Sequence, residues 1–389
     1  MIFPNRFQPK TKAFEDYWEF EDGREMLSRL TKTPDISKAN DSVHLLYEKD
    51  DLSDAVINDF FIGQSFPKAL QSITDFASGK NDISSAPESI KELLQQMNEV
   101  PQWLDPELVA LGVDVSNRSG KSGLIVLRNY SLMLGYQSAA INKPLIATGA
   151  LHSGAVKRIA DTTNFWYAVT GKDALFPGND GFLYCLRTRI VHAYSRIMIK
   201  EKLDWKLSEQ GEPLNYWDMQ ATYIGFSLIY MQGLKKLGMK ISDEEIKSVY
   251  HLWKYIGYLI GIPANILPDN DVEAIENLYL WSKTQPETDA DSIELAKALH
   301  EEPLTAPWPP KPFQKRFIQH VNIAFNHFLI GKRSCDVLQL PAAEYPKIAN
   351  VVLNANRLDN YLCQFDWYKK QQIKKGRSEQ LVIRNRVNA

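Results

Sequence analysis

The sequence predicts an all-α protein. Apolar residues recur at helical spacing along most of the 389 residues. The alternation of apolar and polar residues that is typical of strands is nearly absent, and VIRNRV at 382–387 is the one segment that invites a strand. Glycines, prolines and short polar stretches separate the periodic segments. With no internal repeat, these observations predict about a dozen helices.

The composition is that of a globular protein with a sizeable core. Hydrophobic residues make up 44% of the chain and aromatic residues 11%, and the formal net charge is -2. A charge so close to neutral does not favour nucleic acid as a partner. The cysteines Cys185, Cys335 and Cys363 form no CxxC pair, which favours reduced thiols over a disulfide framework.

The N-terminal stretch and the hydropathy of the chain indicate the cellular location to expect. The N-terminal stretch carries acidic residues early and lacks the apolar segment of a secretory signal. No run of about 18 apolar residues occurs, so the sequence predicts no transmembrane helix. A cytoplasmic location is therefore expected.

The first part of the chain predicts an arm followed by several short helices. Residues 1–48 are polar and mixed in charge, and we expect an arm that wraps on the body, with one short helix from 17 to 31. Helical periodicity follows at 51–63, 67–79, 84–99 and 100–112, with glycine or proline at segment ends. Residues 119–142 are mostly apolar and rich in small residues, which favours close approach of another helix or a ligand.

Capping signals organise the part of the chain after residue 200. Asn215 or Asp218 is placed to cap a helix that ends at Gly238. Ser242 and Glu245 stand at capping-box spacing and predict the start of the next helix. Further helices are expected at 271–281, up to residue 300, and at 313–330.

The C-terminal end, from Tyr368 onwards, is strongly basic. It contains seven basic residues and one acidic residue. This composition favours a solvated, partly disordered end of the chain, and an electrostatic docking segment is the alternative.

Two helical segments between residues 149 and 196 contain the most informative side chains. The first places Arg158 and Thr162 at i and i+4, on one face. The second, a mostly apolar helix at 182–199, carries a single imidazole, that of His192. A buried haem iron requires one imidazole in a dry pocket and cations for its propionates.

Arginines stand a turn before and a turn after this imidazole. Arg189, His192 and Arg196 lie at i, i+3 and i+7, on one face. The spacing fits a haem ligand between two propionate partners. It also fits a core histidine that bonds a carbonyl, beside two arginines in ion pairs, so both interpretations remain open.

Motifs of several other chemistries are absent. The chain contains no GxGxxG after a strand, no P-loop, no HExxH and no GxSxG. It contains no Glu-x-x-His of a di-iron bundle. His44, His152, His251 and His300 lie in settings typical of surface or capping residues. His192 is therefore the best candidate for an iron ligand.

Six short motifs occur in a consistent order along the chain. They are VPQWLD (100–105), TGAL with VKRIADTTNF (148–165), RTRIVHAYSR (187–196), GEPLNYWDMQATYIGFS (211–227), GLKKLGMKISDEE with WKYIGYLIGIPANILP (233–268) and LQLP (338–341). Together they resemble the latex-clearing (rubber oxygenase) and MpaB-like oxygenase family. The resemblance covers about residues 45–345. We accordingly divide the chain into an N-terminal arm (1–48), an oxygenase-like haem domain (49–345) and a C-terminal helix with a basic tail (346–389).

The resemblance implies a fold and a set of site residues. The fold would be a globin-like helical core around haem b, with additional N- and C-terminal helices. His192 matches the axial iron ligand of the family. Arg158 and Thr162 match positions near the open face of the iron. Arg189 and Arg196 match arginines that flank the ligand, and they would pair with propionates or support the structure.

The chain departs from the rubber-cleaving branch of the family at two places. Asp161 stands where that branch has a lysine before the threonine, and we count it among the candidate catalytic residues because its carboxylate is able to bond a distal water. Asn142 lies near the position of that branch's glutamate base, and an amide cannot accept a proton. These departures leave open whether a reaction of the rubber-cleaving type occurs.

The resemblance implies a haem-b-dependent oxygenase that acts with dioxygen on an unsaturated isoprenoid or lipid-like substrate. The alternative is a non-catalytic haem or lipid carrier or sensor with the same fold, which Asp161 and Asn142 favour. A third possibility is a haem-free helical interaction protein. A shared fold does not by itself decide among these functions.

Overall fold

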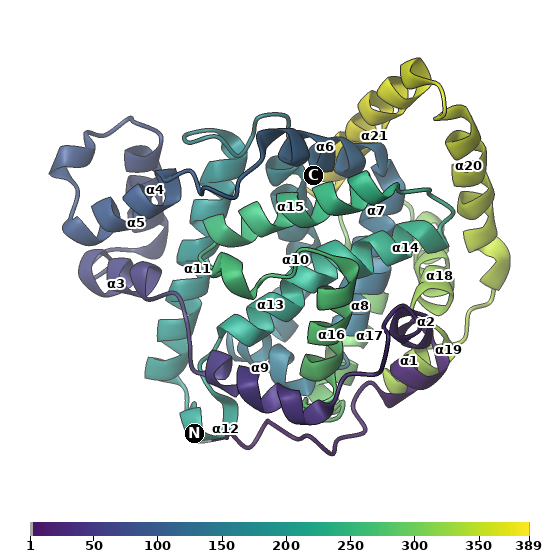
Figure 1. Ribbon diagram of the computed structural model, residues 1–389, viewed down its shortest axis with the longest axis horizontal. Coiled ribbons are helices and arrows are strands. Elements are labelled where there is room, and N and C mark those ends of the chain that lie inside the picture. The colour runs from purple at the N-terminus through teal and green to yellow at the C-terminus, as the bar shows by residue number, and fades with distance from the viewer. Residues whose placement is uncertain (1–2, 389) are drawn as a thin grey trace.

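The computed structural model describes residues 3–388, except for the side chains of residues 150–153. The expectation for His152 therefore lies outside the described residues. Every regular element in the described part is an α-, 3-10 or π-helix, which confirms the predicted all-α fold. Figure 1 shows a helical body with a small group of helices on one side and a projecting helix pair on the other. None of the described helices is both long enough and apolar enough to cross a bilayer.

The N-terminal arm wraps on the body, as expected, but its helix is broken. The elements are α1 (Glu15–Phe20), α2 (Asp22–Leu27) and the 3-10 helix η1 (Ile36–Leu46). The predicted single helix at 17–31 was wrong because Glu21 adopts an extended backbone between α1 and α2. Its carboxylate accepts a hydrogen bond from the backbone N–H of Arg333, at 3.0 Å. This hydrogen bond links the break between α1 and α2 to the first turn of α19 (Lys332–Val337).

A second group of helices lies beside the body. It comprises α3 (Asp51–Phe60), α4 (Phe66–Ala77), the 3-10 helix η2 (Ile83–Ser85) and α5 (Glu88–Asn98). These helices form the lobe at the left of Figure 1. Both α3 and α4 pack against α11 (Asp180–Lys202), the helix that carries His192. The sequence had predicted α3, α4 and α5, and the structure confirms them.

The body contains the helices from α6 to α19. They are α6 (Pro106–Arg118), α7 (Gly120–Val126), η3 (Leu127–Leu132), α8 (Met133–Gly135), α9 (Ala139–Ala147), α10 (Ala150–Val169), α11 (Asp180–Lys202), α12 (Leu207–Gln210), α13 (Tyr216–Ile224), η4 (Gly225–Ile229), α14 (Tyr230–Lys236), α15 (Asp243–Leu259), η5 (Ala264–Ile266), α16 (Asp271–Ser282), α17 (Ala290–Thr305), α18 (Pro312–Leu329) and α19 (Lys332–Val337). The capping box of Ser242 and Glu245 begins α15, as predicted. Helix α15 packs along α6, where a Cβ on Gly112 would lie 2.5 Å from the carbonyl oxygen of Ser248.

Two π-helical segments interrupt the long helices of the core. The segments η3 and η4 pack against each other, and the hydroxyl of Ser131 donates to the carbonyl of Gly225 at 2.7 Å. The π-turns were not predicted, because their residues keep the apolar spacing of an ordinary helix. Such turns recur at functional sites because they displace side chains from the regular α register.

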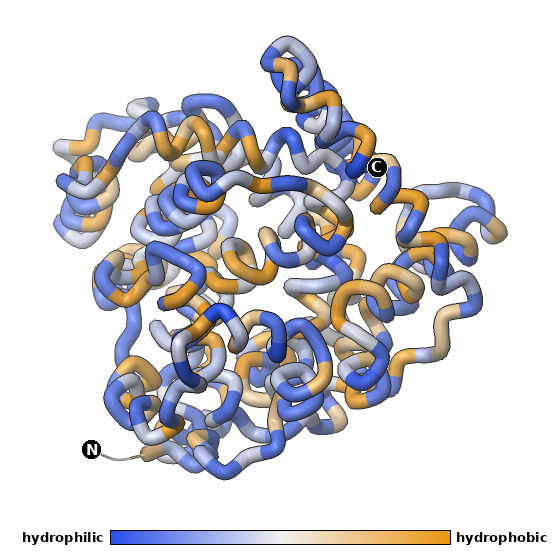
Figure 2. The backbone as a smooth tube through the Cα atoms, turned by 45° about the vertical axis from the view of Figure 1, so that its right-hand side comes forward, coloured by the Kyte–Doolittle hydropathy of each residue, from blue (hydrophilic) through white to orange (hydrophobic). Residues whose placement is uncertain are grey.

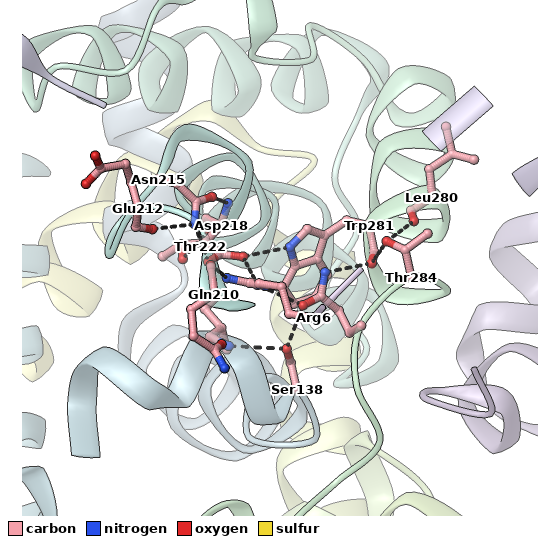
Figure 3. Close-up of polar contacts among 12 residues, drawn as sticks. Arg6, Ser138, Gln210, Glu212, Asn215, Asp218, Thr222, Leu280, Trp281 and Thr284 are labelled. Atoms are coloured by element: carbon pink, nitrogen blue, oxygen red, sulfur yellow. Dashed lines mark hydrogen bonds and ion pairs between the residues drawn. The ribbon is translucent and has the colours of Figure 1, made fainter. Parts of the chain in front are cut away.

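The arm is fixed to the body by a buried ionic cluster (Figure 3). The guanidinium of Arg6 lies 2.7 and 2.8 Å from the two carboxylate oxygens of Asp218, and it also donates to Gln285 at 2.9 Å. The indole of Trp281 donates to the same carboxylate at 3.0 Å. Asn215 caps α13 by accepting from the backbone N–H of Asp218. These bonds satisfy the buried carboxylate and both terminal nitrogens of the buried guanidinium, whereas Nε of Arg6 has no partner.

The C-terminal end is structured, and the expectation of a solvated tail was wrong. After the 3-10 helix η6 (Pro346–Ile348), helices α20 (Ala349–Leu362) and α21 (Asp366–Val387) form a hairpin, and α21 includes the segment that invited a strand. Helix α21 packs on α6, α7 and α10. Gln380 donates to the carbonyl of Ser116 at 2.8 Å, and the Arg377 guanidinium lies 3.4 Å from the ring centre of Tyr167. Along α21, the basic residues that suggested a solvated tail alternate with residues that contact the body.

Candidate functional site

His192 lies near the middle of α11 and has an unsatisfied nitrogen. Its Nδ1 is buried and has no hydrogen-bond partner. Burial, with a smaller effect from the charge of Arg196, lowers the pKa of the imidazole to about 4. The ring is therefore neutral at physiological pH. A core histidine that bonds a carbonyl would have satisfied this nitrogen, since an unpaired buried polar atom costs about 1–3 kcal/mol.

The arginines on either side of His192 are engaged with the region of α3. The guanidinium of Arg189 lies 2.6 and 2.9 Å from the carboxylate oxygens of Asp50. Arg196 contacts Asp54 at 2.6 and 2.9 Å. Both arginines are buried. The sequence left propionate pairing and structural support open for these arginines. Because both guanidinium groups already bind carboxylates of the chain, this geometry favours structural support.

The ion pair of Asp50 and Arg189 should make the unfolding free energy depend on pH. Burial opposes ionisation, but the hydrogen bonds and charge of Arg189 outweigh it and hold the pKa of Asp50 below its ordinary value. The stabilisation is therefore complete above about pH 4, the range of an unfolded carboxyl, and is lost as the pH falls through the folded-state pKa. We expect Asp50→Asn to lower the unfolding free energy at neutral pH by about 2 kcal/mol, the size of one hydrogen bond to a charged group, as measured by urea denaturation.

Measurements of the unfolding free energy at low pH, and a variant at the neighbouring residue Asp51, provide the controls for this prediction. The difference between Asp50→Asn and the parent should shrink as the pH is lowered, since the parent loses its own carboxylate. Asp51→Asn removes an exposed carboxylate paired with Lys49, and the unfolding free energy should change by less than about 1 kcal/mol. Equal losses at positions 50 and 51 would contradict the assignment.

The two residues predicted to lie near the open iron face belong to α10. The guanidinium of Arg158 lies 5.2 Å from the ring centre of Tyr136, and it forms no ion pair with a described residue. Thr162 follows one turn later, and both side chains are half-buried. Gly154 breaks α10 with φ of 79°, a conformation that favours glycine, so the part with Arg158 has its own axis. Arg158 is thus a half-buried cation without a carboxylate partner.

The structure corrects the prediction for Asp161. Its side chain is 61% exposed and forms an ion pair with Lys157, one turn earlier on α10. The sequence placed it next to Thr162, but adjacent residues on a helix point about 100° apart. Asp161 consequently faces solvent, and we remove it from the candidate catalytic residues.

An aromatic cluster connects α10 with α15 and the π-helical segment η4. The ring of Trp253 lies 4.5 Å from Phe226, 5.5 Å from Trp166 and 6.4 Å from Phe165. The indole nitrogens of Trp166 and Trp253 are buried without hydrogen-bond partners. Both α10 and α15 pack against α11. This aromatic wall was not predicted from the sequence, although Phe165, Phe226 and Trp253 lie in three of the six motifs.

Other residues of the motifs have structural roles. Asn215 and Asp218 hold the N-terminal arm through Arg6, as described above. Asn142 is buried, and its amide donates to the carbonyl of Tyr136 at 2.9 Å and to Ser292 at 3.0 Å. His251 accepts a hydrogen bond from the backbone N–H of Asp105. Motif membership therefore does not by itself identify a residue of the site.

The architecture defines an all-helical protein in which α11 carries a neutral imidazole whose Nδ1 is buried without a hydrogen-bond partner. The Nδ1 of His300 is also buried without a partner, but the Nε2 of that ring contacts Gln319 at 3.2 Å. Residues 123–353 match the family described as ER-bound oxygenase mpaB/B'/Rubber oxygenase, catalytic domain. Because this match covers more than half of the chain, the chain belongs to that family, and the resemblance noted in the sequence is confirmed.

Two known proteins are similar to this chain. A rubber oxygenase from Streptomyces sp. (strain K30) is 24% identical over 186 residues, which are 47% of this chain and 45% of that protein. The match therefore spans about half the length of this relative. The solved structure of latex clearing protein LCP in the closed state superposes with a TM-score of 0.63 at 18% identity. It covers 90% of this chain and 93% of the other, and it shows a shared fold.

Proposed function

We propose that this protein is a haem-b-dependent oxygenase with His192 as the axial iron ligand. The observation that carries the proposal is the buried Nδ1 of His192, which has no partner on an imidazole that stays neutral. A neutral imidazole in an apolar interior is the ligand that haem iron takes from a protein. Membership in a family of oxygenase catalytic domains supports the same reading.

The donor set fits a haem better than a bare metal ion. Among the described residues, His, Cys, Asp and Glu side chains form no group of three or more that could hold a metal. A porphyrin carries its own equatorial ligands, so a single protein imidazole is sufficient. When bound, the haem would supply redox chemistry with dioxygen that side chains do not provide.

Residues on the helices that pack against α11 would then prepare the site. The aromatic wall of Phe165, Phe226 and Trp253 would offer an apolar surface to a substrate. Arg158 is the best candidate for a propionate or another anion, since Arg189 and Arg196 already bind carboxylates. The hydroxyl of Thr162 can donate a hydrogen bond from the same face of α10.

We propose an unsaturated isoprenoid or lipid-like molecule as the substrate, together with dioxygen. The support is the apolar character of the aromatic wall and the similarity to a protein named rubber oxygenase. The cytoplasmic location, the globin-like form of the core and the domain boundaries at residues 48 and 345 remain predictions.

A haem or lipid carrier without catalysis is the second candidate. The observation that favours it is the environment of Asn142, the position near the family's glutamate base. Its amide is buried and bound to Tyr136 and Ser292, and it cannot take up a proton. A carrier would need the iron ligand but no base.

Reconstitution with haemin followed by product analysis tests the proposal. We expect a Soret band after removal of excess haemin, and incorporation of ¹⁸O from labelled dioxygen into an unsaturated isoprenoid oligomer. A stable Soret band without a labelled product would favour the carrier. Failure to retain haemin would refute the haem assignment and favour a haem-free interaction protein.

Arg158→Met tests the role of the half-buried cation. We expect oxygenase turnover to fall roughly tenfold or more, because a charge-assisted hydrogen bond to an anionic group is lost. Asp161→Asn, on the same helix but exposed, should leave turnover within about twofold. Both variants should keep the Soret band. Equal activity of Arg158→Met and the parent would exclude Arg158 from the site.

A further inference from the structure

The hairpin of α20 and α21 ends in an exposed aromatic tip. We define the hairpin tip as Leu358, Tyr361, Phe365 and Trp367, which are 63%, 69%, 49% and 66% exposed. In Figure 1 the turn between the two helices projects beyond the body. Apolar segments alternate with polar ones on the helix pair that projects at the top of Figure 2. Single exposed apolar residues are common, but exposed apolar side chains that gather in one patch mark an interaction site.

Helix α20 presents an apolar stripe that continues into the tip. Val351, Leu358 and Tyr361 lie at i, i+7 and i+10, on one face, and all three are exposed. Of the 14 residues of α20, only Ala349 is buried. The helix therefore contributes little to the core, and its outer face is open in the described structure.

Cations stand beside the aromatic tip on α21. Trp367, Lys370 and Lys374 lie at i, i+3 and i+7, on one face, and all three are exposed. Among the described residues, no carboxylate lies within ion-pair distance of Lys370, Lys374 or Lys375. Residues 344–378 contain seven basic and three acidic residues. The tip is thus apolar and aromatic, with unneutralised positive charge next to it.

The inner side of the hairpin is firmly attached to the body. Asn356 donates to the carbonyl of Leu237 at 2.8 Å, and Lys369 pairs with the buried Glu245 at 2.8 Å. Tyr368 donates to Asp359 across the turn, at 2.5 Å. These contacts hold the tip in its projecting position, so little conformational freedom is lost when it binds a surface.

We propose that the hairpin tip docks on an anionic phospholipid bilayer, with Leu358, Phe365 and the rings of Tyr361 and Trp367 in the interfacial region. Tyrosine and tryptophan combine an apolar body with a polar end, which suits the headgroup boundary. Nearby lysines add attraction to anionic lipid. A second copy of this chain fits less well, because a symmetric contact through this surface would bring the basic residues of both copies together.

Vesicle binding by the full chain tests this proposal without haem or turnover. We expect cosedimentation with phosphatidylcholine vesicles that contain phosphatidylserine, and much weaker binding to phosphatidylcholine alone. The double variant Lys370→Gln/Lys374→Gln should bind the anionic vesicles roughly tenfold more weakly, and added salt should act in the same direction. Tyr361→Ser/Trp367→Ser should reduce binding to either vesicle.

Matched variants outside the hairpin provide controls. Ile62→Ser/Phe176→Ser removes exposed apolar side chains, and Lys38→Gln/Lys68→Gln removes exposed lysines, without touching the hairpin. Both controls should bind like the parent. Trp367→Phe should keep binding while it loses the quenching by brominated lipid that the parent displays. Equal binding by all variants, or sedimentation as a dimer that the tip variants abolish, would overturn the proposal.

Discussion

We expect haem binding to be lost when His192 is replaced by alanine. The parent, reconstituted with haemin, should retain a Soret band through gel filtration, whereas His192→Ala should bind haemin at least 100-fold more weakly. The physical reason is that His192 carries the buried, neutral and unpartnered nitrogen on α11. Oxygenase turnover, if it depends on this ligand, should fall below detection in the same variant.

A control and a rescue separate ligand loss from unfolding. His251→Ala removes an imidazole that bonds the backbone of Asp105, and its Soret band should match that of the parent. Added imidazole should restore the band of His192→Ala, because the deleted ring leaves space for a free ligand. If the alanine variant keeps an unchanged Soret band and folds normally, another residue must hold the haem.

The sequence predicted the helices whose signals are local. The capping box of Ser242 and Glu245 formed as expected, because both hydrogen bonds involve residues within one turn. His192 could also be singled out as a candidate ligand, since a lone imidazole on an apolar helix is visible in the sequence. That its Nδ1 lacks a hydrogen-bond partner could not be predicted, because this depends on every helix packed around α11.

Long-range contacts decide what the sequence left open or predicted wrongly. For Arg189 and Arg196 the sequence left propionate pairing and structural support open, and Asp50 and Asp54 reach them from more than a hundred residues away in sequence. The basic end of the chain looked solvated, yet α21 packs through Gln372, Gly376 and Gln380. In each case, the partner that decides the role comes from a different part of the fold.

The second large effect is expected at Arg6, whose removal should loosen the N-terminal arm. Arg6 is 4% exposed and bonds both carboxylate oxygens of Asp218. Arg6→Ala leaves that carboxylate buried without its cation, so we expect the unfolding free energy to drop by roughly 3–5 kcal/mol. Urea denaturation measures this loss. Limited proteolysis should cut the arm of the variant before the body.

The charge left behind, rather than the lost contact alone, should dominate this effect. Arg6→Ala/Asp218→Asn removes both charges, and the amide can still accept the hydrogen bond from Trp281. The double variant should therefore be more stable than Arg6→Ala. Arg333→Ala, which breaks an exposed pair with Asp16, should cost less than about 1 kcal/mol. A double variant no more stable than Arg6→Ala would mean that packing of the arm, and not the unpaired carboxylate, sets the cost.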